Sequence, residues 1–157
     1  MEPVQGASQK ELVALAAKYR ESLRHAVYLT RSLDAEGDLT TAQVSTLNML
    51  AEAPLRIGGI ARRSGIKVPS ATEQVIRLEA AGLVLRRPDP DDARGVLVQL
   101  TERGAQELAA ANQRRNAILA ERLAALSPDD RTVLEAAVPV IDRLNSLIPE
   151  MTKPEKK

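Results

Sequence analysis

Two short segments of β-forming residues interrupt a chain whose other apolar residues repeat with helical spacing. These segments are residues 83–87 and 95–100, and the stretch between them, 88–92, contains two prolines and three aspartates. Apolar runs of this length on both sides of a proline- and aspartate-rich stretch are typical of a β-hairpin. The sequence therefore predicts a hairpin with a charged tip inside an otherwise helical domain.

Two capping boxes mark the helices that precede the hairpin. In Ser8–Glu11 and again in Thr40–Gln43, two polar side chains stand three residues apart, so each can satisfy a backbone N–H of the other residue. With the apolar spacing that follows, they predict helices over 8–33 and 40–52, separated by a break at 34–38. The buried face of the second helix should consist of Val44, Leu47 and Leu50.

Glycine and proline delimit two shorter helices directly before the hairpin. Residues 56–64 predict a short helix that ends at Gly65, and the next helix has Pro69 in its first turn and ends at Gly82. The two helices form a helix-turn-helix. The apolar face of the second one consists of Ala71, Val75 and Leu78.

Two helices should follow the hairpin. Thr101 can cap a long helix that runs to about Leu126, and Ser127 with Pro128 begins a last helix that runs to about Leu147. The charged segment 152–157 is expected to be frayed.

The composition excludes several classes of function. The chain of 157 residues has no cysteine and one histidine, so thiol chemistry and sites with two histidines are excluded, and we expect no catalytic residue, metal or cofactor. Aromatic residues make up 1%, which removes the platforms on which single-stranded nucleic acid stacks. The net charge of +1 hides a basic excess in residues 56–95, where 8 Lys or Arg stand against 5 Asp or Glu. This excess favours an anionic partner, and the partner should be a duplex.

Targeting and membrane signals are not found in the sequence. The first residues are neither basic nor apolar, and no apolar run approaches the roughly 18 residues that a membrane helix needs. We therefore expect a cytoplasmic protein without a membrane partner.

Residues of the hairpin and of the helix after it form a signature. Asp92 and Arg94, followed by Leu100, Thr101 and Gly104, give the pattern Asp-x-Arg, five residues, Leu-Thr-x-x-Gly. This pattern and the order of the elements over residues 8–147 resemble the MarR family of bacterial winged-helix regulators. Further residues at that family's usual offsets are Thr40, Gln43, Ile60, Ala61, Gly65, Thr72, Arg77, Leu78, Gly82 and Leu83.

The resemblance implies a fold and an assembly. The fold would be mainly α with a small β-wing, a winged helix-turn-helix with long N- and C-terminal dimerisation helices. Residues 1–37 and 101–157 would dimerise and residues 38–100 would form the DNA-binding lobe. Two departures from the family pattern are Glu73, where many relatives have a basic residue, and Gly58–Gly59, which replace a polar helix start. The absence of cysteine excludes the family's peroxide-sensing branch.

The second helix of the motif supplies candidate base contacts, because the first turns of such a helix enter the major groove. Gln74 has the donor and acceptor that match adenine, and Ser70 can reach either strand. The structural alternatives are a solvated Gln74, an internal bond for Thr72 and an ion pair between Arg77 and Glu73. The candidates on this helix are Lys67, Pro69, Ser70, Thr72, Gln74 and Arg77.

The hairpin supplies a second set of candidate DNA contacts. Arg94 follows the turn, where a guanidinium can enter the narrow minor groove, and Asp92 could hold it by a charge-assisted bond. The alternative is an exposed ion pair that contributes little. Arg86 and Arg87 should face opposite sides of their strand, and we assign the phosphate contact to Arg87.

The resemblance also implies an effector cleft between the dimer helices and the DNA-binding lobe. His25 and Tyr28 lie on one side of the first helix, and with Arg24 and Asn48 they could bind a small anionic or aromatic effector. The alternative is a packed tyrosine and an internally satisfied histidine.

The sequence thus predicts a homodimeric repressor that binds a near-palindromic duplex operator and is released by a small ligand. The alternative is a winged-helix protein-interaction module without DNA binding, which Glu73 and the weak net charge of residues 56–95 keep open. An enzyme has no support, because no residues form an acid–base pair. Apolar residues beyond what one small lobe can cover favour the dimer: Leu12, Leu15, Val133, Leu134, Val138, Ile141 and Leu144.

Overall fold

The computed structural model describes residues 8–32 and 39–147. The predicted helix break at 34–38 and the charged segment 152–157 lie outside the described residues. The chain divides into two compact units, residues 1–41 and 42–157, and each is described by itself.

The first unit contains helix α1, Gln9–Ser32. Its predicted capping box is confirmed: the Ser8 amide donates to Glu11 Oε2 over 2.7 Å, and the Glu11 amide donates to Ser8 Oγ over 3.3 Å. No residue of α1 whose exposure is described is buried, and Leu12 and Leu15 are 49% and 64% exposed. The apolar side of α1 is therefore not buried within the described residues of the first unit.

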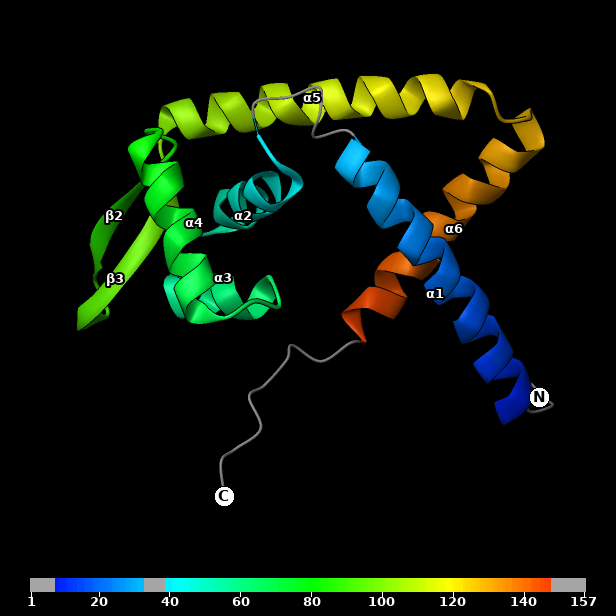
Figure 1. Ribbon diagram of the computed structural model, residues 1–157, viewed down its shortest axis with the longest axis horizontal. Helices are drawn as coiled ribbons and strands as arrows, with labels where there is room; N and C mark the ends of the chain where they lie inside the picture. Colours follow the sequence, from blue (N-terminus) through cyan, green and yellow to red (C-terminus); the bar gives the residue numbers. More distant parts are fainter. Residues whose placement is uncertain (1–7, 33–38, 148–157) are drawn as a thin grey trace. The chain divides into compact units, whose positions relative to one another are not determined.

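The second unit is a winged helix-turn-helix with two helices after the wing, and α2 enters it from the last residue of the first unit. The strands form an antiparallel sheet in the order β1-β3-β2. In Figure 1 the hairpin β2–β3 lies beside α4, with which β2 is in contact. The elements are α2 Thr41–Glu52, β1 Leu55–Arg56, α3 Ile57–Arg63, α4 Val68–Ala80, β2 Val84–Asp89, β3 Asp92–Leu100, α5 Glu102–Ala124 and α6 Pro128–Ser146.

The hairpin is longer than predicted. Its strands reach Asp89 and Asp92, so only Pro90 and Asp91 remain between them, whereas the sequence suggested a turn over 88–92. The cause is local, because Asp89 Oδ1 accepts the Asp91 amide hydrogen over 3.0 Å and closes the turn with its own side chain. The two-residue strand β1 was not predicted.

Both helices of the helix-turn-helix end at the predicted glycines. Gly65 and Gly82 have φ values of 64° and 72°, in the left-handed region that residues with a Cβ rarely adopt. After each glycine, the next amide donates back into the last helical turn: Ile66 to the Ala61 carbonyl over 3.0 Å and Leu83 to Leu78 over 2.9 Å. These are Schellman motifs, which satisfy carbonyls at the helix end.

The core of the second unit lies where α2, α3, α4 and the sheet meet. Leu47, Ile60, Val75, Leu78 and Val98 are fully buried. Every residue that the sequence predicted on the buried faces of α2 and α4 is buried.

The start of α5 is fixed to the end of the helix-turn-helix. Thr101 Oγ1 accepts the Gly104 amide hydrogen over 2.9 Å and donates to the Gly82 carbonyl over 2.7 Å. A Cβ on Gly104 would lie 1.9 Å from the Leu83 carbonyl oxygen, which explains why the signature has a glycine at this position. The Leu-Thr-x-x-Gly part of the signature therefore joins α5 to the lobe.

The last helix, α6, begins as predicted, because Ser127 Oγ accepts the Asp130 amide hydrogen over 3.1 Å and Pro128 occupies the first turn. None of its residues is buried in the single chain, and Val133 and Val138 are 68% and 48% exposed. Within the described residues, no helix combines the length and the apolar character needed to cross a membrane.

Candidate nucleic-acid interface

Helix α4 presents a polar and partly charged surface from its first turns. Lys67, Pro69 and Ser70 are exposed, and Pro69 stands in the first turn as predicted. Pro69 lacks an N–H, but a first-turn N–H has no partner within the helix, so the helix starts without loss. Helix α4 and its N-cap residue Lys67 therefore carry three of the candidate DNA contacts on their exposed surface.

Gln74 does not share this surface. Its Nε2 donates to the Ala42 carbonyl over 2.7 Å and to Thr46 Oγ1 over 2.8 Å. Thr46 is 1% exposed, so the amide of Gln74 satisfies a polar group inside the lobe. In this structure the amide nitrogen binds α2 and is not free to donate to adenine.

Two further candidates on α4 have partners on the helix itself. The Thr72 hydroxyl donates to the Val68 carbonyl over 2.8 Å, which is the internal bond considered from the sequence. Arg77 Nη2 lies 3.5 Å from Glu73 Oε2, and both side chains are more than two thirds exposed. A pair this long and this exposed contributes little, so Arg77 can exchange Glu73 for a phosphate.

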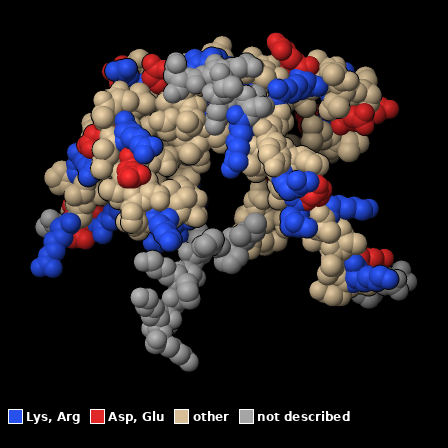
Figure 2. Space-filling model, in the orientation of Figure 1, with Lys and Arg blue, Asp and Glu red and all other residues tan. Residues whose placement is uncertain are grey.

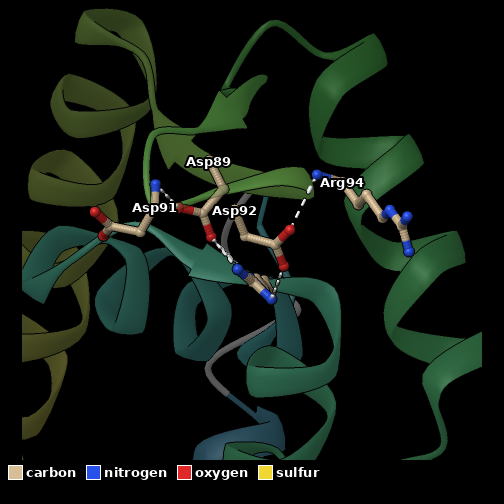
Figure 3. A network of polar contacts seen from close by, with 5 residues as sticks. Asp89, Asp91, Asp92 and Arg94 are labelled. Carbon is tan, nitrogen blue, oxygen red and sulfur yellow. Dashed lines mark hydrogen bonds and ion pairs between the residues drawn. The ribbon is translucent and has the colours of Figure 1, made fainter.

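The wing turn contains a network of ionic and backbone contacts, shown in Figure 3. Asp92 Oδ1 accepts the backbone amide hydrogen of Arg94 over 3.0 Å, while its Oδ2 lies 3.1 Å from Nη1 of Arg56. The side chain of Arg94 is exposed and extends away from this network. The expected bond between Asp92 and the Arg94 guanidinium is therefore corrected: Asp92 holds the backbone of Arg94, because its second oxygen is taken by Arg56.

The two arginines of β2 have different neighbours. Arg86 Nε lies 3.2 Å from Glu79 Oε2 on α4, so this side chain joins the wing to the recognition helix. Arg87 is exposed as well. The pKa of Asp89 is lowered chiefly by the hydrogen bond from the Asp91 amide, and the positive charge of Arg87 also contributes. The phosphate contact of Arg87 stays a prediction.

Charges of both signs are mixed over the lobe. Figure 2 shows basic side chains that project at the end where Figure 1 places the wing tip, with acidic ones beside them. On the face that Figure 2 shows, attraction to a polyanion would come from individual arginines and lysines, because no broad basic patch lies there.

The candidate effector residues are divided between the units. In the first unit, Arg24 Nε donates to Glu21 Oε2 over 3.2 Å, and His25 Nε2 lies 3.5 Å from Glu21 Oε1. The hydrogen bond from Arg24 holds the pKa of Glu21 below its ordinary value. Tyr28 is 62% exposed. In the second unit, Asn48 Oδ1 accepts from Asn112 Nδ2 over 3.1 Å. The effector site stays a prediction.

Sequence reasoning missed one residue of the wing, Arg56. The sequence placed it at the start of a helix, and it is the N-cap residue of α3, but it also lies in β1 and its side chain contacts both Asp89 and Asp92. The available signal was the cluster of aspartates at 89, 91 and 92, whose negative charge favours a nearby cation.

Known proteins with similar sequences and structures were found for this chain. A family model described as the MarR family matches residues 37–95. The chain is 39% identical to an HTH-type transcriptional regulator of Mycobacterium bovis over an alignment of 100 residues. This alignment covers 63% of this chain and 70% of the relative. A regulator of Mycobacterium leprae is 35% identical over 112 residues, 71% and 78% of the two chains.

This chain belongs to the MarR family. Solved structures agree: the transcriptional regulator BldR from Sulfolobus solfataricus has 26% identity and a TM-score of 0.67, covering 88% of this chain and 99% of its own. A MarR family protein from Bacillus stearothermophilus has the same fold, with 21% identity, a TM-score of 0.72 and coverage of 90% and 99%. This MarR-family chain is a DNA-binding transcription regulator with a winged helix-turn-helix.

Proposed function

We propose that this MarR-family protein is a homodimeric repressor that binds a near-palindromic operator through α4 and the wing. The proposed DNA contact rests on the exposure of Arg94. Asp92 holds the backbone of Arg94, while the Arg94 guanidinium extends into solvent. A guanidinium placed in this way suits the minor groove next to the major-groove contact of α4.

The base contacts on α4 are assigned to its exposed residues. Ser70 can reach either strand, while Lys67 and Arg77 suit phosphate or guanine. Glu73 is exposed in the same region, and a carboxylate can accept from the cytosine amino group. Gln74 is left out of the contact set, because its amide nitrogen is bound inside the lobe.

Assembly is proposed from the uncovered faces of α1 and α6. A monomer rarely exposes so many large apolar residues on two helices, and a second copy of the chain can cover them. A two-fold dimer places two recognition helices in successive major grooves, so its operator should be near-palindromic. Repression and release by a small anionic or aromatic effector are supported by membership of the family.

Salt dependence tests the proposed function. Duplex fragments selected by the protein from a random pool supply the probe, and affinity is measured for this duplex and a scrambled one as salt rises. A DNA-binding dimer releases counterions, so the logarithm of its affinity should fall linearly with the logarithm of salt concentration, for both duplexes. A folded protein that binds no duplex at low salt would instead be the protein-interaction module.

A further inference from the structure

The guanidinium of Arg56 bridges two carboxylates of the wing turn. Arg56 Nε and Nη2 both donate to Asp89 Oδ2, over 2.8 Å and 2.5 Å, and Nη1 lies 3.1 Å from Asp92 Oδ2. The arginine therefore spans the two strands of the hairpin where they approach the turn. This arrangement uses the planar fork of a guanidinium, which an ammonium group does not have.

Each bridged carboxylate also holds the backbone of the turn with its other oxygen. Asp89 Oδ1 accepts the Asp91 amide hydrogen, and Asp92 Oδ1 accepts that of Arg94, each over 3.0 Å. A displacement of the Asp92 carboxylate would therefore displace the backbone amide of Arg94, and a displacement of the Asp89 carboxylate would displace that of Asp91. Figure 3 shows these two backbone contacts, from Asp89 to the amide of Asp91 and from Asp92 to the amide of Arg94.

The bridge is packed against the hairpin. The side chain of Asp89 is only 7% exposed, so its negative charge requires a partner. A Cβ at Gly95 would lie 2.9 Å from Arg56 Nη2 and 2.9 Å from the Cβ of Asp89. The glycine of β3 thus leaves the space in which Arg56 lies, which distinguishes this contact from a loose surface ion pair.

Arg56 also belongs to the helix-turn-helix. It is the N-cap residue of α3, and in the sheet it pairs with Leu97 of β3. The same residue thus begins the first helix of the motif with its backbone and holds the wing turn with its side chain.

We propose that Arg56 is a positioning residue for DNA binding, which holds the wing turn in the conformation that presents Arg94 to the duplex. This inference rests on the proposed DNA-binding function. Arg56 acts through the Asp89 and Asp92 carboxylates and the backbone they hold, and its own guanidinium stays on those carboxylates when DNA is bound.

A double-mutant cycle with Arg94 tests this role on the duplex selected by the wild-type dimer. Arg94→Ala and Arg56→Gln should each weaken binding by roughly tenfold, within the range for loss of one DNA contact. In the Arg94→Ala background, Arg56→Gln should have almost no further effect, because the side chain that it positions is gone. Equal losses from Arg56→Gln in both backgrounds would overturn the positioning role.

Two further variants separate position from charge. Arg63→Gln also removes one cation and one ion pair, the contact of Arg63 with Glu52, but this pair lies between α2 and α3. It should leave the preference for the selected duplex over the scrambled one unchanged. Arg56→Lys retains the charge without the fork, and it should restore only part of the affinity that Arg56→Gln loses. Full affinity in Arg56→Lys would show that charge alone matters and would overturn the inference.

Amide chemical shifts test the same contact without DNA. In Arg56→Gln the amide signals of Asp91 and Arg94 should move, whereas Arg63→Gln should leave them in place. Unmoved signals would overturn the role of Arg56 even if the protein binds DNA. Moved signals in a protein whose wild type binds no duplex would instead overturn the proposed function.

Discussion

At the scale of single residues, Gln74 shows how far a side chain's chemistry depends on the direction in which it points. The residue type and its place on the recognition helix suggested adenine recognition, yet its amide donates to Ala42 and Thr46. Helical periodicity explains the difference, because Gln74 lies three residues after the buried Ala71 and four before the buried Leu78. A bidentate contact with adenine would require its amide to leave both internal acceptors.

Gln74→Ala should therefore act on stability. Loss of hydrogen bonds to partly buried acceptors should lower the free energy of unfolding by about 1 to 3 kcal/mol. Thermal or denaturant unfolding measures this loss. Under conditions in which the variant is fully folded, its affinities for the selected and the scrambled duplex should either stay unchanged or fall by the same factor. A change of base preference without loss of stability would return Gln74 to the set of base contacts. Ser70→Ala is the matched control, and it should change base preference and leave stability unaltered.

Asp89 gives the wing a dependence on pH. Its pKa lies below the ordinary value of 3.8, chiefly because it accepts the Asp91 amide hydrogen and also because Arg56 donates to it. A carboxyl group of this kind stabilises the folded state above its unfolded pKa, and that stability is lost as pH falls through the lower, folded pKa. The wing turn should therefore loosen only in acid, below the ordinary range of aspartate.

The same group offers a direct measurement. In Arg56→Gln the pKa of Asp89 should rise toward its ordinary value, because one of the donors to the carboxylate is removed. An NMR titration of the side-chain carboxyl carbon reports this pKa, and Arg63→Gln should leave it unchanged. A pKa for Asp89 that is the same in wild type and Arg56→Gln would contradict the contact.

At the scale of elements, the junction between the helix-turn-helix and α5 depends on a glycine. Gly104→Ala would place a Cβ 1.9 Å from the Leu83 carbonyl, so α5 must move and strain the Thr101 cap. We expect a loss of stability of about 1 to 3 kcal/mol or more, as for other overpacked sites, measured by denaturant unfolding.

Gly58→Ala is the matched control for Gly104→Ala. Gly58 lies in α3, and a Cβ there would meet nothing within 4 Å. Alanine should raise stability by about 0.5 to 1 kcal/mol, because it loses less backbone entropy in a helix than glycine. Equal effects of the two substitutions would show that the Leu83 contact does not constrain α5.

The helices and the hairpin could be predicted because their signals are local. Capping residues, apolar spacing and the glycines at 65 and 82 define the helix limits within a few residues, and the family signature identified the wing. Strand β1 could not be predicted, since two residues show no periodicity and its pairing with β3 joins positions about forty residues apart.

The candidate site was predictable in part for the same reason. Ser70, Lys67 and Arg94 are exposed where the motif places them. The partners of Gln74, Asp92 and Arg56 depend on contacts between elements distant in the sequence, which residue spacing does not reveal. The correct identity of the motif therefore did not determine which side chains remain available to DNA.

At the scale of the whole molecule, α1 and α6 lead to a prediction about assembly. Their exposed leucines and valines, including Leu15 and Val133, should be covered by a second copy of the chain. Light scattering at micromolar concentration should give twice the mass of one chain, and the midpoint of thermal unfolding should rise with protein concentration. A folded species with the mass of one chain would contradict both the dimer and the near-palindromic operator.

The uncovered face of α6 also affects how operator occupancy responds to the amount of protein present. If two chains must associate to cover it, the DNA-binding species forms in proportion to the square of the chain concentration when the protein is dilute. Occupancy of the operator should then rise more steeply than for a monomeric regulator. A modest change in synthesis or degradation of the chain would therefore produce a sharp transition between a free and an occupied operator.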